Sequence, residues 1–403
     1  MSQDTQRDAS RRSFPPMHQR DYLAWPFFDP GHRAFVQSVD EFADSGALDD
    51  VDHHQVDASC RRLVAQLGKA GLLRACVPAA YGGLAPEIES RRLALAREAL
   101  AYRDGLADFS FAMQGLGSGP ISLAGSEALK AEVLPKVLRG ELIPAFALSE
   151  KDAGSDVGAM SCSARRDGAH YVVTGEKTWI SNGGIADLYV LFARTGEAPG
   201  TRGISAFVVY PDDPGFSIAE RIDVMAPHPL ATLRFDEMRI PAERLLGMPG
   251  EGFKLAMRTL DIFRVSVAGA ALGFARRAFD EAVAHAGSRQ IFGAALGEMQ
   301  LTQAKLGEMA AMIDSAALLT YRAAWRRDVQ KLSTTREAAM AKMTATENAQ
   351  AVVDGALQLF GARGVQVGGI MESLYREIRA LRIYEGATEV QKLIVAREVM
   401  RQG

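Results

Sequence analysis

The sequence predicts an α+β protein in which a helical region is followed by a β region and then by a second helical region. Apolar residues recur at helical spacing before about residue 145 and again after residue 252, and short segments rich in β-branched and aromatic residues fill the interval. Because helices and strands do not alternate, this order argues against a doubly wound dinucleotide-binding fold. At 403 residues, the chain is long enough for two or three packed units.

The first helical domain is expected over residues 21–145, after a polar tail at residues 1–20 that lacks the apolar core of a secretory signal. Within the domain, apolar residues repeat at helical spacing over 61–73 and 90–101, and a loop is expected at 78–83.

A glycine-rich run at residues 115–120 belongs to the same domain. Because Pro120 closes the run and no clear strand precedes it, we disfavour a phosphate-binding loop. We expect instead an interruption of a helix near a pocket.

The middle domain is expected over residues 146–247 and the second helical domain over 248–403. Strands are predicted at 170–174, 187–193, 204–210 and 231–235. After Pro249, the last proline, alanine-rich segments with broad apolar faces predict bundled helices at 265–287, 297–329 and 335–360, with a shorter helix after Glu385.

Composition excludes several functional classes. A net charge of −3 gives no basic footprint for nucleic acid. No run reaches the ~18 apolar residues of a membrane helix. The three cysteines (Cys60, Cys76 and Cys162) lack metal-ligand spacing, so we predict no metal site and a reducing, cytoplasmic location.

One carboxylate, Glu385, is placed on a glycine-hinged turn between Tyr384 and an amphipathic helix. From the residues alone, two roles remain open. Glu385 is either a general base whose pKa rises in an apolar site, or a solvated carboxylate near the start of a helix, where negative charge is favourable.

Three runs of sequence resemble motifs of the acyl-CoA dehydrogenase family. They are Phe-Ala-Leu-Ser-Glu-Lys-Asp-Ala-Gly-Ser-Asp at 146–156, Gly-Glu-Lys-Thr-Trp-Ile-Ser-Asn-Gly-Gly at 175–184, and the run at 382–398 that contains Tyr384-Glu385-Gly386. The resemblance covers nearly all of the chain after residue 20. It implies an N-terminal helical domain, a middle β-barrel-like domain and a C-terminal four-helix bundle.

The resemblance also implies a reaction. It is the α,β-dehydrogenation of an acyl-CoA, in which Glu385 removes the α proton, FAD accepts the β hydride, and an electron-transfer flavoprotein receives the electrons. Side chains do not accept hydride, so a cofactor is required. Because flavin contacts in the family come from two chains, a homo-oligomer is implied, usually a tetramer built as a dimer of dimers.

Individual residues match the family's binding positions. Those implied to contact FAD are Phe146, Ala147, Leu148, Ser149, Trp179, Ile180, Ser181, Arg289, Phe292, Met299, Gln300, Gln358, Gly361, Ala362, Ala387 and Glu389. Those implied to contact substrate are Ser155, Asp261, Arg264, Tyr384 and Gly386. The sequence departs from the family pattern at Lys151, Ala362 and Ala387, which stand where proline, glycine and threonine are usual.

Several of these residues have simpler interpretations. Trp179 and Tyr384 could be core aromatic residues, Arg289 a solvated surface arginine, and Asp261 with Arg264 an ordinary helical ion pair.

Alternative functions remain within the same fold. The acyl group could be tethered to a carrier protein, for which Lys254, Arg258 and Arg264 would supply a basic patch, or the enzyme could be an oxidase. A flavin-binding homologue without catalysis is disfavoured by Glu385. The glycines of the 115–120 run suggest room for a bulky acyl group.

Overall fold

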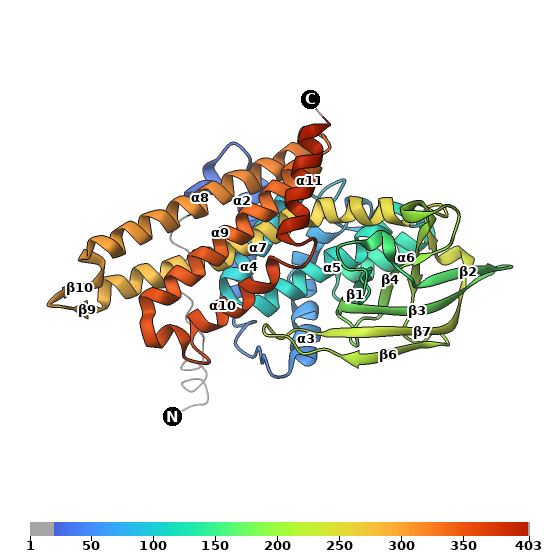
Figure 1. The fold of residues 1–403 in the computed structure, drawn as a ribbon, viewed down its shortest axis with the longest axis horizontal. Coiled ribbons are helices and arrows are strands. Elements are labelled where there is room, and N and C mark those ends of the chain that lie inside the picture. Colours follow the sequence, from blue (N-terminus) through green and yellow to red (C-terminus); the bar gives the residue numbers. More distant parts are fainter. Residues whose placement is uncertain (1–19, 402–403) are drawn as a thin grey trace. The chain divides into compact units, whose positions relative to one another are not determined.

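The computed structural model describes residues 20–401, so all of the predicted tail except Arg20 lies outside the described residues (Figure 1). The described chain forms two compact units. Unit 1 comprises residues 20–50, 89–108 and 264–401, and unit 2 comprises residues 51–88 and 109–263. The three domain boundaries predicted from the sequence stay a prediction.

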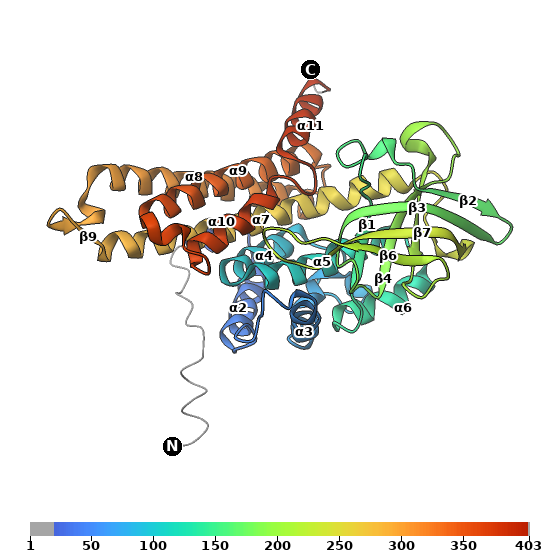
Figure 2. The same cartoon turned by 60° about the horizontal axis from the view of Figure 1, so that its bottom comes forward.

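Unit 1 is a helical assembly. Its helices are α2 (Pro30–Asp44), α4 (Ser90–Arg103), the first turn of α5 (Gly105–Ala124), most of α7 (Gly252–Ser288), α8 (Gln300–Asp328), α9 (Thr335–Phe360), α10 (Ile370–Leu381) and α11 (Thr388–Met400). Short 3₁₀ helices lie at η2 (Asp21–Ala24), η8 (Leu296–Glu298) and η9 (Gly361–Val365), and β9 (Gln290–Ile291) pairs with β10 (Ala294–Ala295). Helices α8 and α9 lie side by side along the unit (Figures 1 and 2).

The core of unit 1 is built largely from alanine. Buried alanines recur along the long helices three, four or seven residues apart, at Ala268, Ala271, Ala275, Ala278 and Ala282 of α7 and at Ala338, Ala341, Ala345, Ala349 and Ala356 of α9. In α8 they form two adjacent pairs seven residues apart, Ala316 with Ala317 and Ala323 with Ala324. Such spacing places them on one face of each helix. Small side chains on facing stripes allow the helix backbones to approach closely.

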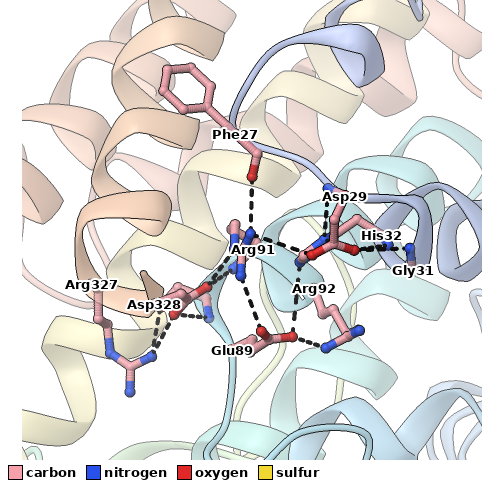
Figure 3. Close-up of polar contacts among 10 residues, drawn as sticks. Phe27, Asp29, Gly31, His32, Glu89, Arg91, Arg92, Arg327 and Asp328 are labelled. Atoms are coloured by element: carbon pink, nitrogen blue, oxygen red, sulfur yellow. Dashed lines mark hydrogen bonds and ion pairs between the residues drawn. The ribbon is translucent and has the colours of Figure 1, made fainter. Parts of the chain in front are cut away.

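The first turn of α4 is capped by a side chain from another helix. Asp328, at the end of α8, accepts hydrogen bonds from the backbone N–H groups of Ser90 and Arg91 at 3.0 and 2.9 Å, and from the Arg91 guanidinium (Figure 3). Carboxylates are favourable at helix N-termini because the first N–H groups lack intrahelical partners. Since Glu89 makes no side-chain cap, Asp328 supplies it and ties α4 to α8.

Unit 2 is built around an eight-stranded mixed sheet. Its strands are β1 (Pro144–Ala147), β2 (Ser163–Asp167), β3 (His170–Ser181), β4 (Leu188–Arg194), β5 (Ile204–Val209), β6 (Phe216–Arg221), β7 (Leu230–Pro241) and β8 (Leu245–Leu246). Their order is β6-β7-β3-β2-β4-β5-β8, and β1 pairs with β4 in parallel. Every residue of β5 and almost all of β4 are buried, so these two strands are the most buried part of the sheet.

The helices of unit 2 are α3 (Val56–Lys69), most of α5, α6 (Glu127–Leu138) and the start of α7. Short 3₁₀ helices occur at η3 (Leu72–Cys76), η4 (Ala79–Tyr81), η5 (Val157–Ala159), η6 (Gly200–Gly203) and η7 (Ala242–Arg244). The predicted strands at 170–174 and 231–235 are parts of the longer β3 and β7, and α10 was not expected.

The expected helix interruption at 115–120 is wrong. These residues lie inside the continuous helix α5, which contains Pro120. Neighbouring groups explain why glycines occur there. A Cβ at Gly115 would lie 2.6 Å from the Phe263 ring, and one at Gly117 would lie 2.7 Å from the Pro144 backbone. Close packing therefore outweighs the low helix propensity of glycine.

Candidate active site

The turn that carries Glu385 has an unusual backbone conformation. Glu385 has φ +53° and Gly386 has φ +93°, so two consecutive residues occupy the left-handed region. Glycine adopts such a conformation without penalty, whereas a glutamate does so only where surrounding contacts enforce it. Strain of this kind is concentrated at functional sites, and Glu385 was already singled out by its sequence motif.

Three side chains from three helices of unit 1 hold this turn. The carbonyl oxygen of Glu385 accepts from Arg264 Nε of α7 at 3.2 Å and from Gln391 Nε2 of α11 at 3.1 Å. The carbonyl oxygen of Gly386 accepts from Lys342 Nζ of α9 at 2.8 Å and from Gln391 Nε2 at 2.9 Å. These contacts fix the backbone and leave the Glu385 carboxylate out of the network.

The carboxylate of Glu385 combines burial with an unused oxygen. Its Oε2 is buried and has no hydrogen-bond partner among residues 20–401. Burial raises the pKa of the Glu385 carboxyl above its ordinary value, although the positive charges of Arg97, Lys342 and Arg264 oppose part of the rise. A fixed carboxylate with a raised pKa and a free oxygen has the properties of a general base.

Tyr384 flanks this carboxylate. Its residue surface is 36% exposed, which does not fit the alternative of a core tyrosine. The Arg97 guanidinium donates a hydrogen bond to its hydroxyl, and burial of that hydroxyl end raises the tyrosine pKa. Tyr384 is therefore a partly exposed residue whose hydroxyl interacts with Arg97.

A second group of predicted site residues lies in unit 2, where β1 and β3 meet. The backbone N–H of Thr178 donates to the Ser149 carbonyl at 3.0 Å, so the segment after β1 lies against β3. At this point β3 contains a bulge, because Thr178 and Trp179 together face Thr232 on β7. Bulges redirect side chains and are frequent next to active sites.

Trp179 lies in that bulge. It has φ +60°, and its side chain is 57% exposed, so the alternative of a β-domain core residue is wrong. A bulky aromatic residue in the left-handed region is a true outlier. The neighbouring Ile180 is buried and Ser181 is half-buried. The strain therefore turns one large aromatic ring outward beside the Phe146–Ser149 segment.

A buried ion pair anchors the Phe146–Ser149 segment. Lys177 Nζ donates to the Leu148 carbonyl at 3.0 Å and to Glu150 Oε1 at 2.8 Å. Glu150 in turn accepts from the N–H groups of Ser161 and Cys162 at 2.7 and 3.0 Å. Burial lowers the pKa of Lys177, which the Glu150 carboxylate opposes. The pair joins the segment after β1 and the residues just before β2 to β3.

The third group lies at one end of unit 1. The His285 ring of α7 stacks on Phe360 of α9 at 4.2 Å and 17°, and this contact joins the ends of the two helices. Burial lowers the His285 pKa, and the charges of Arg289 and Arg363 lower it further. Exposed side chains surround the contact, and Phe292, at φ +50°, is 93% exposed.

The structure places all but two of the predicted site residues, Ser155 and Asp261, in these three groups. The residues at the α7–α9 end are Arg289, Phe292, Met299, Gln300, Gln358, Gly361 and Ala362, and those around the turn are Arg264, Tyr384, Gly386, Ala387 and Glu389. Ala387 is the N-cap of α11, and Glu389 is exposed in its first turn. Ser155 is exposed in unit 2, and Asp261 lies half-buried on α7.

Comparison with known proteins agrees with these motifs. The sequence matches the models of the acyl-CoA dehydrogenase N-terminal domain at residues 29–141, middle domain at 145–238 and C-terminal domain at 250–400. The mitochondrial short-chain specific acyl-CoA dehydrogenase of Rattus norvegicus is 39% identical over 343 residues, covering 84% of this chain and 82% of the relative. The chain belongs to the acyl-CoA dehydrogenase family.

Solved structures share the fold of this chain. Butyryl-CoA dehydrogenase from Megasphaera elsdenii aligns with a TM-score of 0.87 and 31% identity, covering 93% of this chain and 99% of that one. The FAD complex of PigA aligns with a TM-score of 0.85 and 27% identity over 93% of this chain and 99% of that one. These matches support the predicted α+β class, with helical N- and C-terminal domains and a middle sheet domain.

The cofactor of the acyl-CoA dehydrogenase family fits the residues present. The isoalloxazine of FAD is a planar aromatic ring, and Trp179 offers a large exposed ring held in a strained conformation. Arg289 is exposed and offers a planar guanidinium suited to phosphate oxygens. Among residues 20–401, no cluster of three or more histidine, cysteine or acidic side chains is arranged to hold a metal ion.

Sequence reasoning missed four residues that contact or face the turn at residues 384–386. Arg97 and Lys342 interrupt the apolar stripes of α4 and α9, and a charge within such a stripe is the signal that could have found them. Gln391 is fully buried on α11. Asp108 gave no signal, because acidic residues are common in the first turn of a helix.

Proposed function

We propose that this protein catalyses the FAD-dependent α,β-dehydrogenation of an acyl-CoA thioester to the 2-enoyl-CoA, with Glu385 as the catalytic base. The observation that carries the proposal is the carboxylate of Glu385. The carbonyl groups of Glu385 and Gly386 are held by Arg264, Lys342 and Gln391, while Glu385 Oε2 is buried and unpaired among residues 20–401. A buried carboxylate with a purely structural role would accept a hydrogen bond at that oxygen.

Each residue has a defined role in this proposal. FAD, when bound, supplies the hydride acceptor that side chains cannot provide. Glu385 Oε2 takes the α proton, and its raised pKa makes the carboxylate a stronger base. The backbone N–H of Glu385 polarises the thioester carbonyl, and Gly386 leaves space for the substrate because it has no side chain. Ser155, Asp261 and Arg264 complete the predicted substrate contacts.

We further propose a short acyl chain. The glycines of the 115–120 run do not provide the room expected from the sequence, because Phe263 lies against Gly115 and Gly119 and the β1 backbone lies against Gly117. The rat relative is short-chain specific, and the Megasphaera elsdenii relative is a butyryl-CoA dehydrogenase. The close packing around Gly115, Gly117 and Gly119 and the substrates named for these relatives together favour a small acyl group over a bulky one.

A homotetramer and an electron-transfer flavoprotein complete the proposal as the family resemblance implies them. The location of Arg289 and Gln358 at an exposed end of unit 1 supports a role toward a flavin bound mainly by another subunit. The structure contains no helix, within residues 20–401, that is long and apolar enough to cross a membrane. The cytoplasmic location predicted from the sequence stays a prediction.

The alternative of a carrier-tethered substrate is weakened by one observation. The basic patch that would recognise a carrier was expected to include Arg264, but that side chain is buried and bonded to the Glu385 carbonyl. Only Lys254 and Arg258 of the three are exposed.

The deciding experiment is an anaerobic titration of the FAD-loaded protein with straight-chain and branched acyl-CoA thioesters, followed by visible absorbance. Bleaching by short straight-chain thioesters is expected. The Glu385→Gln variant should bind FAD normally and reduce it slower by a factor on the order of 10²–10⁴. A flavin that no free thioester bleaches would contradict the proposed substrate, and bleaching by Glu385→Gln at the wild-type rate would contradict the proposed base.

A further inference from the structure

A buried ion pair lies beside the catalytic turn, and no role assigned above uses it. Arg97 of α4 binds Asp108 of the first turn of α5 through two parallel hydrogen bonds, Nε to Oδ1 and Nη2 to Oδ2, each 2.8 Å long. Arg97 Nη1 also donates to Ser266 Oγ of α7 at 3.2 Å. The two charged side chains are only 4% and 5% exposed.

The pair reaches the residues of the turn. Arg97 donates a hydrogen bond to the Tyr384 hydroxyl, and its positive charge also acts on the Glu385 carboxylate. Asp108 acts on the same two groups with the opposite sign. Of the charged groups that face Glu385, Arg97 comes from α4, Asp108 from α5, Arg264 from α7 and Lys342 from α9.

A purely structural role explains the pair poorly. Burying two charges costs desolvation energy that their attraction recovers only in part, so a buried ion pair is weak evidence for stability. Moreover, α4 is already fastened at its N-terminus by the Asp328 cap (Figure 3). What the Arg97–Asp108 pair adds is a guanidinium of fixed orientation next to the catalytic turn.

We propose that Arg97 and Asp108 act together as positioning residues of the active site. Arg97 holds the Tyr384 hydroxyl and closes one side of the turn, and Asp108 neutralises the guanidinium so that Glu385 does not face an uncompensated buried cation. This inference rests on the proposed role of Glu385 as the base.

In this arrangement, removing Asp108 and removing Arg97 should shift the pKa of Glu385 in opposite directions. Without Asp108, the full charge of Arg97 would stabilise the Glu385 carboxylate, which lowers its pKa and weakens the base. Without Arg97, burial would dominate further and raise that pKa. An unpaired charge at such a site shifts a neighbouring pKa by about one unit or more.

The test measures proton removal separately from hydride transfer. The FAD-loaded protein is incubated in D₂O with a 3-thiaacyl-CoA, which has an acidic α proton but no β carbon to give a hydride. Exchange of the α proton is followed by proton NMR across a range of pD for the wild type, Asp108→Asn, Arg97→Gln and Arg97→Lys. Thermal melting of each variant is recorded in parallel.

The expected result is a pair of opposite shifts. The pD midpoint of exchange should fall by about one unit or more in Asp108→Asn and rise in Arg97→Gln. Arg97→Lys keeps the positive charge but loses the two parallel hydrogen bonds to Asp108. The pD midpoint of this variant should stay near that of the wild type, while its KM for the 3-thiaacyl-CoA rises. If Arg97→Gln does not fold, Asp108→Asn and Arg97→Lys decide the question. Midpoints that all match the wild type, with losses of rate that track melting temperature, would overturn the proposal.

Two controls separate the possible failures. Asp328→Asn removes another buried aspartate that pairs with an arginine of α4, and it should lower stability without moving the midpoint. Glu385→Gln should abolish exchange. If it exchanges like the wild type, the proposed base is wrong; if it does not, yet the midpoints of the Arg97 and Asp108 variants stay fixed, only the present inference fails.

Discussion

The ammonium group of Lys342 lies 2.8 Å from the carbonyl oxygen of Gly386, the residue that follows Glu385. Lys342 is fully buried on the face of α9 that also carries Ala338 and Ala345. Burial lowers its pKa to about 8, so below that pH it brings a positive charge to the turn. The backbone at the candidate active site is therefore held by a buried lysine in an otherwise apolar stripe.

The geometry of the turn predicts that one methyl group added at Gly386 lowers both stability and activity. In Gly386→Ala, the new Cβ would lie 2.4 Å from Gln391 Nε2, and alanine would have to adopt φ +93°. Moving Gln391 breaks its bonds to both carbonyls of the turn, so we expect a loss of about 1–3 kcal/mol in unfolding free energy and of about 10²-fold in kcat. Urea melts and steady-state kinetics measure both. Gly307→Ala, on α8 with no neighbour within 4 Å, is the control and should be neutral or stabilising by up to about 1 kcal/mol.

The raised pKa of Glu385 predicts a pH-dependent stability difference. Because the folded-state pKa of Glu385 lies above the ordinary glutamate value of about 4.5, the folded protein binds the proton more tightly than the unfolded chain. Stability from this group is complete below pH 4.5 and is lost as pH rises through the folded pKa. Glu385→Gln should thus melt at a higher temperature than wild type at pH 8, and the gain should shrink toward pH 4.5. A difference that stays constant between pH 4.5 and 8 would refute this account.

The Lys177–Glu150 pair predicts a link between a buried lysine and flavin binding. Lys177→Met leaves Glu150 buried without its cation and the Leu148 carbonyl without its donor, which should cost about 3–5 kcal/mol of stability. The Phe146–Ser149 segment should shift, so the Kd for FAD should rise and the visible circular dichroism of bound flavin should change.

Two further variants make the lysine experiment specific. Glu176 lies on β3 beside Lys177, and Glu176→Gln breaks its exposed pair with Arg234 of β7, which should leave both stability and FAD affinity nearly unchanged. The double variant Lys177→Met with Glu150→Gln removes both charges and should recover part of the lost stability. Unchanged FAD affinity in Lys177→Met, with the protein folded, would show that the pair serves the sheet alone.

The exposed end of α7 predicts a contribution of Arg289 to cofactor affinity. Arg289→Gln should raise the Kd for FAD by about 10–100-fold, which corresponds to the loss of a charged hydrogen bond to phosphate of about 1.5–3 kcal/mol. Fluorescence quenching of FAD by the apoprotein measures this. Arg239→Gln, which removes an exposed arginine paired with Asp167, should have no effect. Equal affinities for all three proteins would identify Arg289 as a solvated surface arginine.

Local motifs allowed the fold class and many candidate residues to be predicted, because each motif is a short contiguous run. The turn at 384–386 and the outward Trp179 both lie within such runs. Arg97 and Asp108 lie 11 residues apart across a helix break, and their meeting depends on how α4 and α5 pack. No local pattern encodes that contact.

The glycine run at residues 115–120 shows a local pattern that predicted the wrong structure. Glycine and proline together indicate a broken helix by propensity, yet α5 continues through residues 115–120. The tertiary partners decide the outcome, since Phe263 and the backbone of Pro144 occupy the space that side chains at Gly115 and Gly117 would need. Only the positions of these neighbours could have revealed it.

The alanine-rich core of unit 1 restricts which substitutions this part of the chain tolerates. Where large side chains fill a core, truncation leaves a cavity and is the damaging change. Here the facing stripes of α7, α8 and α9 are already reduced to methyl groups, so enlargement is the damaging change. A replacement such as Ala271→Leu or Ala345→Leu should push whole helices apart. Because α7 and α9 also carry Arg264 and Lys342, a side chain enlarged within these stripes can reach the turn that carries Glu385 through the spacing of the helices.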